Sequence, residues 1–88
     1  MSIEITEAVY LDNYRIELRF SDSKRQIIDF RTFLENAQNP ITKKYLDIDL
    51  FKSFKVEFGD LIWNDYELCF PIIDLYENIF SKEMHSVA

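Results

Sequence analysis

The stretch FKVEFGDLIWND, residues 54–65, carries the only glycine of the chain, Gly59. Apolar and charged residues alternate before this glycine, and a second apolar run after it ends at Trp63. A period of two is typical of β-strands that bury one face. Gly59 and Asp60 separate the two runs, and a two-residue loop of type II′ needs a positive φ at its first central position, which glycine adopts without steric cost. The stretch therefore predicts a β-hairpin that turns at Gly59-Asp60.

The first thirty residues predict an antiparallel three-stranded meander. Residues 14–20 alternate strictly between apolar and charged side chains, as in a strand with one buried face. A first strand over residues 3–11 has its alternation broken at Glu7, which indicates a bulge. The pair Asp12-Asn13 favours a tight reversal between these strands, because both residue types tolerate left-handed backbone. A third strand is expected over residues 24–30, after a second turn.

Two short helices are predicted between the meander and the hairpin. From Phe30 onward apolar residues recur at the helical spacing i, i+3, i+4 and i+7, and Asp29 can cap the helix by accepting a free backbone N–H. The pair Asn39-Pro40 ends this helix. A second helix begins after Asp47, another good cap. Its expected buried side is formed by Leu50, Phe51 and Phe54.

A third helix closes the predicted fold. Pro71 suits the first helical position, and the apolar stripe that follows is formed by Ile72, Ile73, Tyr76, Ile79 and Phe80. A short strand is expected just before it, over residues 67–70. We therefore predict one α+β domain over residues 1–80, in which a small antiparallel sheet (the meander plus the Gly59-Asp60 hairpin) packs with two short helices and a C-terminal helix. Residues 81–88 are predicted to form a flexible tail.

Composition and the N-terminal sequence indicate which kind of partner and which cellular compartment to expect. The 88 residues carry a net charge of −6, so the chain is expected to repel nucleic acid and to meet a basic protein more readily. The N-terminus has neither a basic region nor a long apolar run, so we predict no signal peptide and no membrane span. The single cysteine, Cys69, cannot form an internal disulfide, which favours the cytoplasm. Its apolar neighbours predict that it is buried.

The sequence predicts no catalytic, cofactor or metal site. The only histidine, His85, falls in the predicted tail, and a single glycine cannot build a phosphate-binding loop. Asp47 with Asp49, and Asp74 with Glu77, could serve acid–base chemistry or bind a divalent ion. Their simpler interpretation is a helix cap and a solvated helix face. We therefore predict that the chain is not an enzyme, with an enzyme or a divalent-metal-binding protein using surface carboxylates as the alternative.

The aromatic content of 16% can fill a small core or cover an interface. We predict an interaction protein, because tyrosine and tryptophan anchor interfaces and flanking glutamates would supply an acidic rim. A homodimeric structural protein, in which the C-terminal helix packs on a second copy, is a further alternative. The residues predicted to contact the partner are Trp63, Tyr66, Glu67, Tyr76 and Glu77.

Several motifs along the chain match one family. They are Asp29-Phe30, Leu50-Phe51, Val56, Glu57-Phe58-Gly59, Trp63-Asn64 and Leu75-Tyr76. With them the chain resembles the bacterial family called domain of unknown function 2442 over residues 3–77, although Asn64-Asp65-Tyr66 replaces the Pro-Asn-Gly that members often carry. The resemblance implies a small α+β fold without an established activity. Members are often encoded beside another small protein in a pairing similar to toxin–antitoxin organisation, which implies an antitoxin-like partner of a small basic protein.

Overall fold

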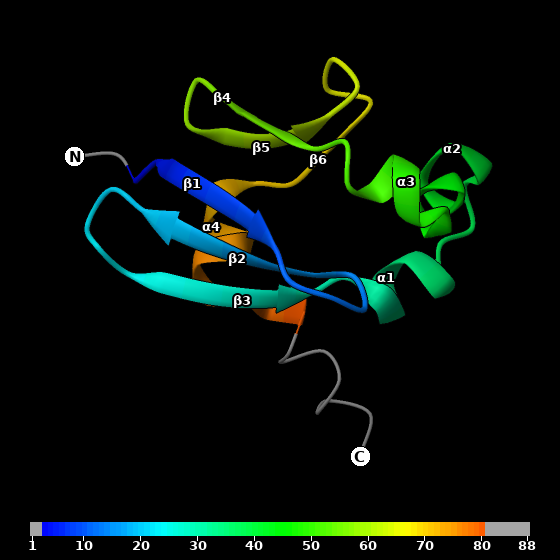
Figure 1. Cartoon of the computed structure of the whole chain (residues 1–88), viewed down its shortest axis with the longest axis horizontal. Helices are drawn as coiled ribbons and strands as arrows, with labels where there is room; N and C mark the ends of the chain where they lie inside the picture. The colour runs from blue at the N-terminus through cyan, green and yellow to red at the C-terminus, as the bar shows by residue number, and fades with distance from the viewer. Residues whose placement is uncertain (1–2, 81–88) are drawn as a thin grey trace.

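In a computed structural model, which describes residues 3–80, the chain forms two antiparallel three-stranded sheets with short helices (Figure 1). The first sheet has the order β1-β2-β3, and its strands are Ile5–Tyr10, Arg15–Phe20 and Arg25–Asp29. The second has the order β4-β5-β6, and its strands are Lys55–Glu57, Asp60–Trp63 and Leu68–Cys69. The predicted α+β class, meander and hairpin are confirmed, but the meander and the hairpin belong to separate sheets. The predicted tail 81–88, with His85, lies outside the described residues.

Short helices connect the sheets. They are α1 (Arg31–Glu35), α2 (Pro40–Lys43), the 3₁₀ helix η1 (Lys44–Leu46) and α3 (Ile48–Phe51). Asn39 starts the unpredicted helix α2, because its side chain accepts the Ile41 N–H at 2.9 Å while Pro40 fits the first turn. Asp47 caps α3 as predicted. The cap position of α1 is Phe30 and not Asp29 as predicted, although the Asp29 side chain accepts the Arg31 N–H at 2.9 Å.

The bulge predicted near Glu7 decides which residues of β1 face the core. The pairing of β1 with β2 shifts its register between Ile5 and Glu7. Beyond this shift Ala8 and Tyr10 pack against the core, whereas Val9 is exposed. A single extra residue therefore reverses the alternation in the second half of the strand.

The β4–β5 hairpin turns one residue earlier than predicted. Glu57 pairs with Asp60, so the loop residues are Phe58 and Gly59, with φ of +52° and +81°. Two successive positive φ angles fit a type I′ turn, in which Gly59 is the second central residue and not the first. The Gly59 carbonyl also accepts the Ile5 N–H at 2.9 Å, and a Cβ on Gly59 would lie 2.9 Å from the Cβ of Glu4. Glycine is therefore required both by the turn and by its contact with the first strand.

Trp63 lies at the centre of an aromatic core. It is 0% exposed, and its indole Nε1 donates to the Phe51 carbonyl at 2.8 Å. Ring centroids of five other aromatic residues lie 5.7–6.2 Å from its own; they are Phe30, Tyr45, Phe51, Phe54 and Phe70. These residues come from the end of β3, from η1 and α3, and from both flanks of the second sheet. One side chain therefore joins both sheets to the helical segment.

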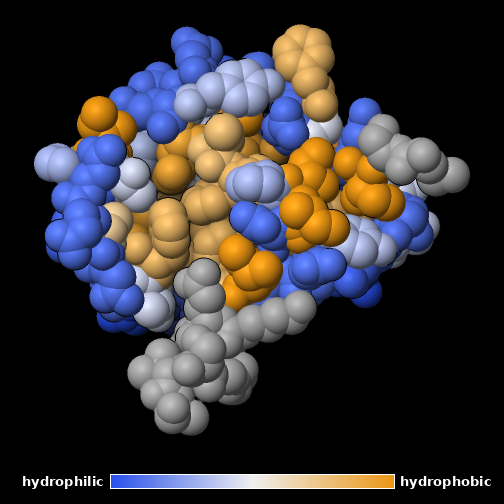
Figure 2. All heavy atoms as spheres, turned by 180° about the vertical axis from the view of Figure 1, so that it is seen from behind, coloured by the Kyte–Doolittle hydropathy of each residue, from blue (hydrophilic) through white to orange (hydrophobic). Residues whose placement is uncertain are grey.

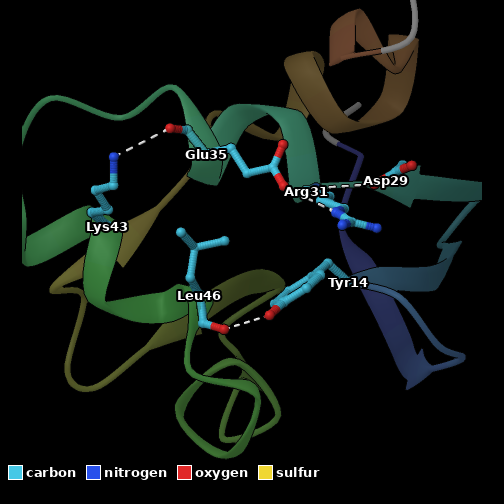
Figure 3. Close-up of polar contacts among 6 residues, drawn as sticks. All are labelled: Tyr14, Asp29, Arg31, Glu35, Lys43 and Leu46. Atoms are coloured by element: carbon cyan, nitrogen blue, oxygen red, sulfur yellow. Dashed lines mark hydrogen bonds and ion pairs between the residues drawn. The ribbon is translucent and has the colours of Figure 1, made fainter.

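Polar contacts add to this attachment of the helical segment (Figure 3). The Tyr14 hydroxyl, at the β1–β2 turn, donates to the carbonyl of Leu46 in η1. Within α1 the Arg31 Nε donates to the Glu35 carboxylate at 3.1 Å, and the Lys43 ammonium of α2 donates to the Glu35 carbonyl at 3.4 Å. The last two contacts are exposed, so they orient the helices more than they stabilise the fold.

α4 (Ile72–Glu77) lies behind β2 and β3 in Figure 1. Most of the predicted apolar stripe packs in or against the core, namely Ile72, Tyr76, Ile79 and Phe80. Leu75 is fully buried, whereas Ile73, expected on the buried stripe, is 56% exposed. The helix ends because Asn78 adopts a left-handed conformation with φ of +54°. The predicted stripe is therefore wrong at Ile73, where Leu75 takes the buried side, and α4 itself ends before residues 79–80.

Two further burial predictions are wrong. Cys69 is exposed, because β6 alternates and its neighbour Leu68 takes the position facing the core. Leu50 is exposed as well, since α3 spans four residues and turns only Phe51 fully into the core.

We expect Gly59→Ala to lower the free energy of unfolding by roughly 1–3 kcal/mol, because alanine would be strained at this φ and would press on Glu4. Urea denaturation followed by Trp63 fluorescence measures the change. Thr32→Ala, at an exposed position of α1, is the control and should alter stability by no more than about 0.5 kcal/mol. A Gly59→Ala protein as stable as the wild type would show that the turn does not depend on glycine.

Trp63→Phe should lower the free energy of unfolding by about 2–3 kcal/mol, because it leaves the Phe51 carbonyl without its donor and a gap beside the remaining rings. Thermal unfolding followed by far-ultraviolet circular dichroism measures the change without the indole signal. Tyr66→Phe, an aromatic substitution in the adjoining exposed loop, should leave the midpoint nearly unchanged. Equal effects of the two substitutions would contradict the central place of Trp63.

Candidate interaction surface

The five residues predicted to bind a partner do not form one surface. Tyr66 and Glu67 lie in the β5–β6 loop at the top of the molecule in Figure 1, whereas Tyr76 and Glu77 lie on α4 behind the first sheet. Trp63 is fully buried, with its indole hydrogen satisfied by a backbone carbonyl. Trp63 therefore has to be removed from the predicted surface, because the fold uses its entire side chain.

Glu67 holds the β5–β6 loop on η1. Its Oε1 accepts hydrogen bonds from the Lys44 ammonium at 2.8 Å, the Tyr45 hydroxyl at 2.6 Å and the Asn64 amide at 3.3 Å. These donors, Lys44 first, lower the pKa of Glu67 from 4.5 to about 2. Burial, followed by the hydrogen bond to Glu67, raises the pKa of Tyr45 to about 12. The charge of Glu67 is therefore matched by Lys44 and is engaged within the fold.

Tyr76 holds α4 against the first sheet. Its hydroxyl donates to the Asp22 carboxylate at 2.6 Å, and its carbonyl accepts the Gln26 side-chain amide at 2.6 Å. The Lys24 ammonium lies 4.1 Å from the centre of its ring. The hydrogen bond from Tyr76 is the main cause that lowers the pKa of Asp22. Glu77, one residue further on, is exposed and forms no ion pair or side-chain hydrogen bond among residues 3–80.

An exposed aromatic ring and partly exposed acidic side chains come together at the end of the β4–β5 hairpin. Phe58 is 89% exposed, the highest value among the large apolar residues described. Glu57 and Asp60 pair across the hairpin on either side of the two loop residues. Glu4 adjoins the same turn at Gly59. We call this surface the acidic tip and define it by Glu4, Glu57, Phe58 and Asp60.

Ion pairs neutralise only some of the acidic side chains in the described part of the chain. Among residues 3–80 five acidic side chains form ion pairs with lysine or arginine; they are Asp12, Glu7, Glu17, Glu35 and Glu67. Within the same residues Glu4, Glu57 and Asp60 form none. Lys55 is the only cation in the sequence of the hairpin, two residues before Glu57. The tip therefore presents negative charge that the described part of the fold does not neutralise.

Apolar side chains also gather on the face opposite to that of Figure 1. Figure 2 shows them in the middle of this face, with hydrophilic side chains along much of its rim. The helices and the segment after β6 contribute partly buried residues that pack against the core, namely Phe33, Phe70, Ile72 and Ile79. These residues are an outer layer of the core. Phe58 differs from them, because it neither belongs to the core nor packs against it.

Sequence reasoning missed Phe58, Glu4, Glu57 and Asp60 as surface residues. Alternation counted Phe58 on the same face as Phe54 and Val56. Had the loop been placed at Phe58-Gly59, the type I′ pattern would have moved Phe58 to the tip and paired the two acidic residues across it. The available signal was therefore the position of glycine within the turn.

Three of the four acidic side chains considered as an alternative site lie at the starts of helices. Over residues 3–80 no three His, Cys, Asp or Glu side chains come close enough to hold a metal ion. Of the two acidic pairs considered from the sequence, Asp47 accepts backbone N–H groups at the start of α3. Asp49 and Asp74 lie in the first turns of α3 and α4, where negative charge favours the helix. No helix among these residues has the length and apolar character needed to cross a membrane.

Residues 5–81 match the family described as Protein of unknown function (DUF2442), so the chain belongs to this family and the resemblance seen in its motifs is confirmed. No curated protein matches the chain, and neither does any solved structure.

Glu67→Gln should make the thermal midpoint of unfolding depend less on pH in acid. Because the pKa of Glu67 in the fold, about 2, lies below its ordinary value of 4.5, the carboxylate stabilises the fold fully above about pH 4.5. This stabilisation is lost as the pH falls through about 2. Thermal midpoints measured between pH 5 and pH 2, in the range set by these values, should fall more for the wild type than for Glu67→Gln. Glu77→Gln is the control and should follow the wild type; parallel curves for all three proteins would contradict the role of Glu67.

Proposed function

We propose that this DUF2442 family member is a protein–protein interaction module that binds a basic protein through its acidic tip. One observation carries the proposal: the exposed ring of Phe58 lies at a turn beside three carboxylates, those of Glu4, Glu57 and Asp60, that form no ion pair within residues 3–80. Aromatic rings supply contact area at a small entropic cost, and unpaired charge speeds the encounter with an opposite charge. The tip combines both requirements of an interface with a basic protein.

The mode of action that we propose is occlusion. Binding would cover a basic surface of the partner and keep it from its own target, as an antitoxin-like protein does with a small basic toxin. The net charge of −6 supports this choice of partner, since most of the molecule attracts a basic protein before contact. The mechanism needs no catalytic residue and no cofactor. An exposed, unpaired Cys69 agrees with action in the reducing cytoplasm.

The test is a pull-down with the tagged chain from a lysate of the organism that encodes it, at low salt, with mass spectrometry of the proteins retained. We expect one basic protein in stoichiometric amount, released as the salt concentration rises. The triple variant Glu4→Gln, Glu57→Gln, Asp60→Asn should lose most of this protein.

The matched control is Asp49→Asn, Asp74→Asn, Glu77→Gln, which removes the same number of charges from exposed or partly exposed positions on α3 and α4. It should retain the partner. Equal losses by both triple variants would mean that net charge matters and the acidic tip does not. An empty eluate at low salt would contradict the proposal as a whole. Light scattering that gave twice the monomer mass of 10.6 kDa would favour the homodimer instead.

A further inference from the structure

We propose that Phe58 is the anchor of this interaction and that its ring enters an apolar pocket of the partner whose rim carries lysine or arginine. The inference rests on the proposed function, which requires only that the acidic tip binds a basic protein. It adds the residue that supplies the contact and the shape of the surface that receives it. The observations behind it are the backbone conformation of Phe58, its exposure and the charges around it.

The backbone of Phe58 is held in a conformation that phenylalanine disfavours. Its φ of +52° falls in the left-handed region, where Cβ crowds the following carbonyl oxygen. Asparagine, aspartate and glycine take this region far more readily, and they dominate the first central position of type I′ turns. The fold therefore carries a strained, bulky residue at a position for which better turn formers exist.

Two other aromatic residues of the described chain have positive φ. Tyr66, with φ of +68°, lies in the β5–β6 loop and is 44% exposed. Tyr14, with φ of +64°, has an intramolecular use, because it packs its ring 5.3 Å from that of Phe51 and donates its hydroxyl to the carbonyl of Leu46. Phe58 has no comparable contact, because it is 89% exposed and packs against no core residue. Within the described part of the chain, the fold gains nothing from this ring to offset the strain, and strain of this kind gathers at binding sites.

The charges around Phe58 indicate the chemistry of the partner that its ring would bind. Glu57 and Asp60 flank the two loop residues and pair directly across the hairpin, and Glu4 adjoins Gly59. A pocket that receives the ring must therefore accept three carboxylates at its rim, for which lysine and arginine are the matching groups. A second copy of the chain, with its own net charge of −6, is a poor match, and an anionic membrane surface would repel the tip.

The hairpin presents the ring in a fixed place. The Gly59 carbonyl accepts the Ile5 N–H at 2.9 Å, and β5 ends in the buried Trp63. The turn is therefore tied at its tip to the first sheet and at its base to the core. A ring presented in this way loses little freedom on binding, which favours affinity.

Photo-crosslinking tests the contact in the full chain. The photoreactive analogue p-benzoylphenylalanine is placed at position 58 or, as the control, at position 73, the next most exposed large apolar residue. After irradiation in the cells that encode the protein, we expect position 58 to yield one adduct with a basic protein and position 73 to yield none. No adduct from position 58, an equal adduct from both positions, or an adduct of twice 10.6 kDa would each overturn the proposal.

Binding to the crosslinked protein, once purified, separates this inference from the proposed function. Phe58→Ala should weaken the complex at least about tenfold, whereas Ile73→Ala should leave it unchanged. Far-ultraviolet circular dichroism confirms that each variant is folded. If the wild type binds a basic protein through the acidic residues and Phe58→Ala binds equally well, the anchor is wrong and the proposed function stands. If the wild type binds no basic protein, both fail.

Discussion

The burial of Trp63 is the interaction on which the rest of this structure depends. The buried side chains of residues 3–80 form one core, and the indole joins the end of β3, the helical segment and the second sheet within it. Its hydrogen bond to the Phe51 carbonyl fixes β5 against α3 at 2.8 Å. Because β5 is held at this end, the opposite end of the hairpin projects from the core and reaches β1 through Gly59. The acidic tip is therefore a consequence of how the core is packed.

Much of the fold could be predicted from the sequence, because its signals are local. Alternation located the strands, Asp47 and Asn13 marked a cap and a turn, and the break at Glu7 marked a bulge. The errors arise where apolar residues recur at the period of the correct strand or helix but were assigned to the wrong side of it. Phe58 was counted with Phe54 and Val56 because alternation alone does not distinguish a phenylalanine that ends a strand from one that begins a turn. Ile73 was placed inside because an apolar residue at 73 or at 75 fits the helical spacing, and the fold buries Leu75.

The candidate surface was harder to predict than the fold. Composition correctly indicated an excess of aromatic and acidic residues, but it could not separate those that the fold uses from those left outside. Trp63 fills the core, Glu67 is matched by Lys44, and Tyr76 holds α4 on the β2–β3 turn. Each of these uses joins residues distant in sequence, so no local pattern could reveal it. The fold does not use the hairpin tip in this way, because the backbone of Phe58 is strained there and its ring is not buried.

The most direct test of this account is the free energy of unfolding of Phe58→Asn, measured by urea denaturation of the isolated protein. Asparagine tolerates the left-handed conformation that the turn imposes, and the fold gives up no buried contact when the ring is removed. The account predicts that the variant is more stable than the wild type by roughly 0.5–1 kcal/mol. A variant less stable than the wild type would show that the fold needs Phe58, and the ring would then not be free to serve a partner.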